Sequence, residues 1–119
     1  MLLVMVCHLT MKIWQSNLNQ FDVYINPIAK GRSLYPYVCC LQSDLLDGLS
    51  TRVICFVTGD PTMAFDKVSV PALIDDTEFY LCMNVVATIE SKRLNNLVCN
   101  LSDWRSDIVN AYDALLMGI

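Results

Sequence analysis

The sequence predicts a mainly β (α+β) domain, an antiparallel sheet or small barrel with one α-helix packed on it at the carboxyl end. Five or six short apolar runs separated by turn-forming residues predict the strands, and the apolar spacing within residues 101–119 predicts the helix. The length of 119 residues suits one domain. A composition of 55% hydrophobic and 17% charged residues excludes a disordered chain.

Three strands are predicted in the first half of the chain. Residues 21–25 (FDVYI) alternate between apolar and polar side chains, as a half-buried strand does. Residues 35–41 (YPYVCCL) form the second strand, with Pro36 near its start, where a missing N–H does least harm. Residues 53–57 (VICFV) form the third, and their unbroken apolar character indicates burial on both faces or a place in an interface.

The second half of the chain predicts a hairpin and one further candidate strand. Residues 68–74 read as an edge or irregular strand, because Pro71 cannot donate a backbone hydrogen bond. Residues 75–77 (DDT) predict a turn, after which residues 78–83 return antiparallel. Residues 85–89 are a further candidate strand.

The helix is predicted over residues 102–117, after the polar stretch 90–100, for which no element is predicted. Ser102 or Asp103 is the expected N-cap, and Gly118 stands where a glycine most often ends a helix. One helical face carries the apolar residues Trp104, Ile108, Ala111, Tyr112 and Leu115.

The end of this helix is expected to be a docking surface rather than a catalytic centre. Asp113 lies in or near its last turn, and no Lys or Arg is there to offset the negative end of the helix dipole. Leu116, Met117 and Ile119 add apolar groups beside this negative charge. The alternative is that the end packs on its own domain or on a dimer mate.

No motif of known catalytic chemistry is present in the sequence. Asp44 and Asp47 lie three residues apart and precede Gly48, so we expect them to cap a turn rather than to form an acid/base pair. A single histidine, His8, leaves no second histidine to activate a nucleophile. We therefore expect no enzyme activity and no cofactor.

The six cysteines are expected to be free and mostly buried. They form no CxxC pair, and most of them lie inside apolar runs, where cysteine packs as a small hydrophobic residue. A zinc or other metal site is not expected, and a reducing cytoplasm is the expected compartment. The six are Cys7, Cys39, Cys40, Cys55, Cys82 and Cys99.

Charge argues against direct binding of nucleic acid. Eight Lys and Arg stand against twelve Asp and Glu, which gives a net charge of -4, and the basic residues are scattered along the sequence. Nucleic-acid binding needs a clustered positive face. No stretch reaches the length of a membrane span, so no membrane contact is expected either.

The domain is predicted to span residues 19–119, after a poorly packed amino-terminal extension at residues 1–18. The extension lacks the periodicity of the residues that follow, and Met11 offers a second possible start of translation. It also lacks the basic region and the cleavage site of a secretion signal.

Three segments of the chain resemble the CcdB toxins, which belong to type II toxin–antitoxin systems. They are FDVYINP at residues 21–27, YPYVCCLQSDLLDGLSTRVI at 35–54 and LSDWRSDIVNAYDALLMGI at 101–119. The resemblance implies an SH3-like antiparallel β-barrel with a small β wing and one C-terminal helix. It also implies a cytoplasmic homodimer that poisons DNA gyrase by binding its A subunit and trapping the cleaved-DNA complex. A CcdA-like antitoxin would neutralise it.

The poisoning motif of this family is a carboxyl-terminal Trp-Gly-Ile, which falls on Met117, Gly118 and Ile119. The resemblance therefore implies that these residues bind gyrase, although Met117 departs from the pattern. Ile89 and Glu90 also depart, since they stand where the family tends to have Val-Pro. The extension before Asn19 has no counterpart.

Two further functions are weighed against a gyrase poison. The departure at Met117 allows a non-toxic dimeric module that still binds an antitoxin but no longer poisons gyrase. A nuclease is the remaining alternative, because other toxins of this barrel shape cleave RNA. The single histidine and the scattered basic residues weigh against it.

Overall fold

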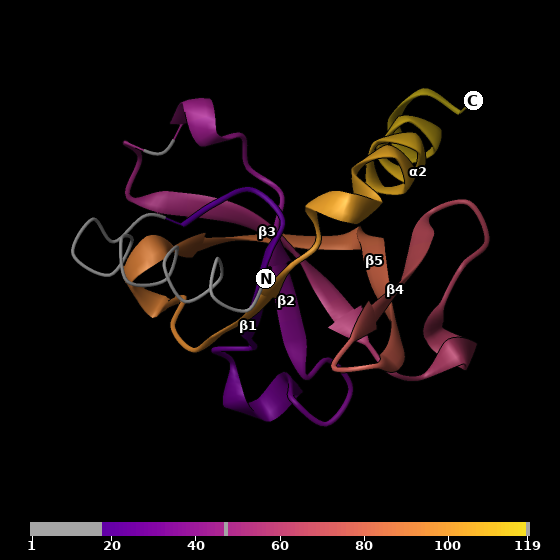
Figure 1. Cartoon of the computed structure of the whole chain (residues 1–119), viewed down its shortest axis with the longest axis horizontal. Helices are drawn as coiled ribbons and strands as arrows, with labels where there is room; N and C mark the ends of the chain where they lie inside the picture. The colour runs from indigo at the N-terminus through magenta and orange to yellow at the C-terminus, as the bar shows by residue number, and fades with distance from the viewer. Residues whose placement is uncertain (1–17, 47, 119) are drawn as a thin grey trace.

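The computed structural model describes residues 18–46 and 48–118, which form six strands and a carboxyl-terminal helix, α2, over Arg105–Met117 (Figure 1). Five short 3₁₀ turns lie between these elements. The strands are β1 (Asp22–Ile25), β2 (Tyr37–Cys40), β3 (Thr51–Thr58), β4 (Ser69–Ile74), β5 (Thr77–Glu90) and β6 (Leu97–Asn100). The turns are η1 (Ala29–Gly31), η2 (Asp44–Leu46), η3 (Pro61–Met63), η4 (Ser91–Arg93) and η5 (Ser102–Trp104).

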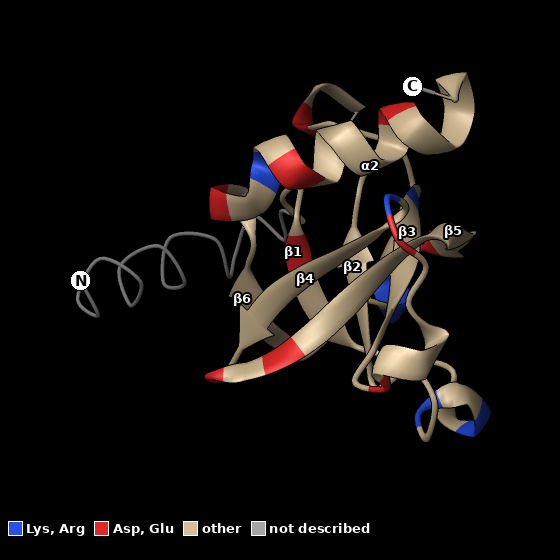
Figure 2. Ribbon diagram, turned by 90° about the vertical axis from the view of Figure 1, so that its right-hand side faces the viewer, with Lys and Arg blue, Asp and Glu red and all other residues tan. Residues whose placement is uncertain are grey.

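The strands form one curled sheet in the order β4-β5-β3-β2-β1-β6, and every neighbouring pair is antiparallel. The predicted mainly β, CcdB-like fold is therefore confirmed, and its sheet curls into a half-barrel. Strand β1 lies between β2 and β6, so sheet formation joins the two ends of the described domain. Figure 2 shows α2 lying across one side of this sheet.

The predicted hairpin is confirmed and joins β4 to β5. Asp75 and Asp76 both have positive φ, 53° and 62°, as the two central residues of a type I′ turn do. Pro71 lies on β4 at the edge of the sheet, where its missing N–H removes no bond to a further strand.

Strand β5 is longer than predicted and joins the two candidates at 78–83 and 85–89 into one element of 14 residues. Its pairing with β3 shifts in the middle: Cys55 lies opposite Val86, whereas the next residue, Phe56, lies opposite Cys82. The extra residues of β5 increase twist and bend the strand. The gap in the predicted pattern marks this irregularity rather than the end of a strand.

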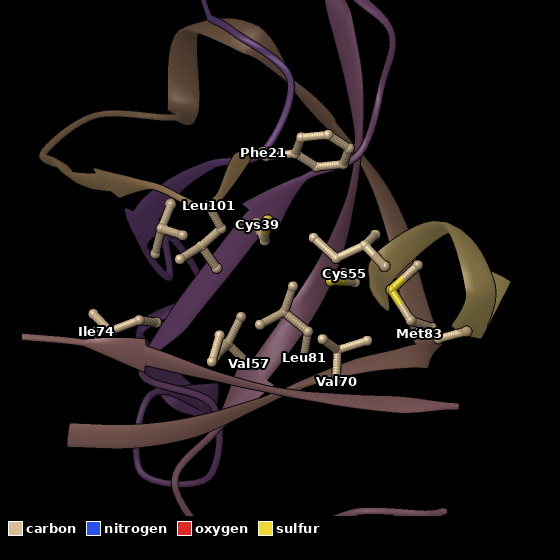
Figure 3. Close-up of a cluster of buried hydrophobic side chains, with 13 residues drawn as sticks. Phe21, Cys39, Cys55, Val57, Val70, Ile74, Leu81, Met83 and Leu101 are labelled. Carbon is tan, nitrogen blue, oxygen red and sulfur yellow. The ribbon is translucent and has the colours of Figure 1, made fainter. Parts of the chain in front are cut away.

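Two clusters of buried side chains lie on opposite faces of the sheet. Neighbours along β3 alternate between them, with Ile54 in the smaller cluster and Cys55 and Val57 in the larger. The predicted burial of this strand on both faces is therefore confirmed. Ile108 and Ala111 of α2 complete the larger cluster, which Figure 3 shows between the sheet and the helix.

Candidate functional site

The candidate site is the end of α2, which we call the tip and define as residues 115–118. The helix is anchored through Ile108 and Ala111, whose side chains are only 2% and 4% exposed. Exposure then rises along the helix, to 59% at Leu116 and 69% at Met117. The helix thus presents apolar side chains at its carboxyl end to solvent, as expected for a docking surface.

The start of the helix differs from the prediction. Ser102 and Asp103 lie in the 3₁₀ turn η5, and the N-cap of α2 is Trp104, which makes no side-chain capping bond. The side chain of Asn100 caps the turn instead, because its Oδ1 accepts a hydrogen bond from the backbone N–H of Ser102 at 2.9 Å. Asn100, two positions before the predicted cap Ser102, therefore provides the side-chain cap, and it caps the turn η5 that precedes α2.

The end of the helix is as predicted. Gly118 adopts the left-handed conformation with φ of 71°, and its N–H donates to the carbonyl of Ala114 at 3.1 Å. A Cβ at this position would meet no atom within 4 Å, so the backbone conformation alone favours glycine. Ile119, the third residue of the predicted gyrase-binding motif, lies outside the described residues.

The tip carries no compensating cation. The last turn of α2 has no basic residue, whereas Asp107 and Asp113 lie along the helix and Arg105 lies at its start (Figure 2). The carboxylate of Asp113 is negative, and the free carbonyls of the last turn carry partial negative charge. A partner that docks here gains most if it offers a cation beside an apolar surface.

An apolar groove of about 360 Å³ runs beside α2. It lies between the helix and the segment that contains η2, and its walls include Phe21, Leu46, Val53, Met83 and Tyr112. No pattern in the sequence indicates this groove, because its walls come from segments far apart in the chain. The wall residue Leu46 is 50% exposed, and Leu45, which precedes it in the chain, is 92% exposed.

Phe21 connects the groove to the start of the helix. It is 4% exposed and has a positive φ of 70°, an uncommon conformation for an aromatic residue. The guanidinium of Arg105 lies 5.7 Å from the centre of its ring, and Nη1 of Arg105 donates to Oε1 of Gln20 at 3.3 Å. These contacts fix the first turn of α2 against the beginning of the domain.

Of the two carboxylates considered near η2, the structure describes Asp44. Oδ1 of Asp44 accepts a hydrogen bond from the backbone N–H of Gln20 at 2.8 Å, so it joins two distant segments rather than capping its own turn. Oγ of Ser43 accepts from the N–H of Leu45 within the turn. Asp47 lies outside the described residues.

The cysteines of the described segments are buried or half-buried and carry free thiols. Burial raises the pKa of the Cys40 and Cys82 thiols, and it raises the pKa of Cys99 to about 11. These three thiols are therefore protonated at neutral pH, which makes them poor nucleophiles. No group of His, Cys, Asp and Glu that could hold a metal ion occurs among the described residues. Cys7 and His8 lie outside them.

The curled antiparallel sheet and the terminal helix define a small β-rich domain with an exposed apolar helix end. The family model described as "CcdB protein" matches residues 20–118. The chain therefore belongs to the CcdB family, which places it among the toxins of toxin–antitoxin systems.

A solved structure described as an endoribonuclease from mycobacterial species is similar in fold. Its TM-score is 0.65 at 12% sequence identity, and the match covers 87% of this chain and 93% of the other. At this identity the likeness concerns the fold alone. No curated protein matches the chain. Within residues 18–46 and 48–118, no helix is long and apolar enough to cross a membrane.

Proposed function

We propose that the protein is a gyrase poison that binds the A subunit of DNA gyrase through its tip and traps the cleaved-DNA complex. Membership in the CcdB family supports this proposal. The observation that carries it is the 69% exposure of Met117, directly before a glycine that ends the helix in the left-handed conformation. Met117, Gly118 and Ile119 occupy the positions of the family's poisoning motif.

The proposed partners are a second copy of the chain, gyrase and a CcdA-like antitoxin, all in the cytoplasm. The apolar groove and the exposed leucines around it support protein partners, because a large apolar patch on a small domain usually marks an interface.

We further propose that the protein has no catalytic activity of its own and needs no cofactor. Gyrase supplies the DNA cleavage, and the toxin only has to bind a state in which the DNA is cut. Incubation of purified protein with RNA tests this part of the proposal directly. The proposal would be contradicted if RNA were degraded by the purified protein and if a substitution in this protein abolished that degradation.

Met117 is expected to make this protein a weaker poison than a Trp-bearing relative. An indole over a guanidinium contributes about 0.5 to 2 kcal/mol, whereas the methionine thioether offers apolar contact without a ring face. At two equivalent sites of a dimer, the difference is about 1 to 4 kcal/mol if the contributions add. This corresponds to a change from about five-fold to several hundred-fold in affinity.

A gyrase DNA-cleavage assay tests the role of the tip. The Met117→Trp variant should trap cleaved DNA at lower concentration than the wild type, and deletion of Gly118 and Ile119 should abolish trapping. Neither change should much alter antitoxin binding, which serves as the control for folding. If all three proteins trap cleaved DNA equally, the tip is not the working surface.

The second candidate function is a non-toxic dimeric module that binds an antitoxin without poisoning gyrase. Met117 in place of the family's Trp favours it. Capture of the antitoxin without growth arrest on induction would support this alternative, and recovery of poisoning by Met117→Trp would show that the missing indole is the cause.

A further inference from the structure

A second cleft, which we call the basic cleft, lies away from the tip. It has a volume of about 490 Å³, and its walls include Arg32, Lys92, Arg93, Asn95 and Asn96. Pairing of β1 with β6 brings these residues together, since the N–H of Ile25 donates to the carbonyl of Asn96 at 3.4 Å. In Figure 1 the two adjoining turns, η1 in indigo and η4 in orange, lie away from α2.

The cleft concentrates positive charge on an acidic protein. Three of the eight Lys and Arg line it, although the chain has a net charge of -4. Nζ of Lys92 lies 3.9 Å from Glu90, but both side chains are more than half exposed, so this ion pair is weak. Arg93 makes no ion pair with any residue in the described part of the chain.

Arg32 is held in place before any ligand arrives. Its Nε donates to the backbone carbonyl of Asn26 at 2.6 Å. Asn26 is fully buried, and its side chain bonds the carbonyl of Tyr35 at 2.8 Å and the N–H of Ile28 at 2.9 Å, which fixes the loop. The terminal guanidinium nitrogens of Arg32 make no hydrogen bond to the rest of the described residues, so the fork remains free for an anion.

These groups suit a phosphodiester backbone better than a row of carboxylates. A guanidinium fork binds two phosphate oxygens at once, and a lysine adds a point charge. The Asn95 and Asn96 amides donate and accept hydrogen bonds, as contacts to sugars and phosphates require, whereas a stretch of acidic side chains offers only acceptors. No aromatic ring lines the cleft to stack on bases, so its contacts would not depend on base sequence.

We propose that the basic cleft binds the phosphodiester backbone of nucleic acid independently of base sequence. This goes beyond the proposed gyrase contact, because no tip residue lines the cleft. It also revises the expectation from the sequence that nucleic acid is not a partner. Residues far apart in the chain looked scattered there, whereas the fold gathers them.

Binding of labelled duplex DNA, followed by fluorescence anisotropy at several salt concentrations, tests the proposal. Three phosphate contacts predict that affinity falls about 40-fold between about 50 and 200 mM salt. The double variant Lys92→Gln/Arg93→Gln keeps only Arg32, so its affinity should be lower and should fall only about four-fold over the same range. All three residues are exposed, so the fold should tolerate these changes.

The matched control is Lys67→Glu, an exposed site outside the cleft, which changes the net charge by the same amount. It should retain the wild-type salt dependence. Equal weakening by the double variant and by this control would show an effect of net charge alone and would overturn the proposal. So would equal competition by a polyglutamate peptide of matched charge, which would identify the cleft as an acidic-peptide site, or a failure of the wild type to bind DNA.

Discussion

Asp22 is a buried carboxylate that ties three parts of the chain together. Its Oδ2 accepts hydrogen bonds from the N–H of Asn19 at 2.9 Å and from the hydroxyl of Tyr24 at 3.1 Å. Its Oδ1 accepts from Nδ2 of Asn100 at 2.8 Å. Burial, followed by the nearby charge of Asp22, raises the pKa of the Tyr24 hydroxyl, which stays protonated and able to donate.

Replacing Asp22 should therefore destabilise the fold. We expect Asp22→Ala to lower the free energy of unfolding by about 2 to 4 kcal/mol, because it leaves buried donors without an acceptor. Urea denaturation followed by circular dichroism measures this change. The control is Asp113→Ala, at an exposed site on α2, which should change stability by less than about 0.5 kcal/mol. Equal midpoints for the two variants would show that the network contributes little.

Some residues at the candidate site could be predicted from the sequence, and others could not. Gly118 was predictable, because a helix end that needs a positive φ selects glycine locally. The positive φ of Phe21 leaves no such signal, since an aromatic residue adopts it only when distant partners require it. The partner of Asp44 was missed for the same reason, because the accepted N–H lies 24 residues away.

At the scale of elements, local chemistry was enough for the hairpin and the edge strand but not for β6. Pro71 and the Asp75-Asp76 pair carry their structural reason in the sequence. Strand β6, however, lies in a stretch that reads as polar, and none of its four residues is fully buried. Strand β6 forms because it pairs with β1, which lies at the other end of the domain in sequence. Pairing between such distant segments leaves no pattern in the local sequence.

The β4–β5 turn offers a direct test of this reasoning. Asp76 has φ of 62°, in the second central position of a type I′ turn, where glycine is preferred. We expect Asp76→Gly to stabilise the protein by about 0.4 to 1 kcal/mol by removing this strain, measured as a higher melting temperature.

The same substitution should have the opposite effect in the helix. Asp107 lies in the first turn of α2, where glycine loses more backbone freedom and the stabilising charge at the helix start disappears. Asp107→Gly should therefore lower the melting temperature. A decrease for both variants would mean that the hairpin turn is not strained.

At the scale of the whole molecule, neither cleft was visible in the sequence. The apolar groove combines Phe21, Met83 and Tyr112, and the basic cleft combines Arg32 with Lys92 and Arg93. Periodicity identifies which residues share a face of one element, but it does not show which elements become neighbours. The helix end was predictable as a surface because one continuous segment forms it.

The apolar groove leads to a prediction about oligomeric state. We expect a dimer at micromolar concentration, measured by light scattering, because the groove and its exposed leucines leave a large apolar area uncovered. Charges in the groove, introduced as Leu46→Asp with Tyr112→Asp, should shift the protein to monomer.

The control for this experiment is Leu34→Asp. Leu34 is 54% exposed, close to the 50% of Leu46, but it does not line the groove. This variant should remain dimeric. A monomeric wild type would contradict the prediction, and dissociation by both changes would place the interface elsewhere.

The position of β1 inside the sheet has a consequence for protein synthesis. This strand, which begins at residue 22, lies between β2 and β6, and β6 ends only at residue 100. Leu101, Ile108 and Ala111 then complete the larger core cluster. A chain still emerging from the ribosome therefore cannot close its sheet or cover its core until residues up to Ala111 have been synthesised. Domains generally fold as units, so we expect the folded surfaces, the tip among them, to form only after that point.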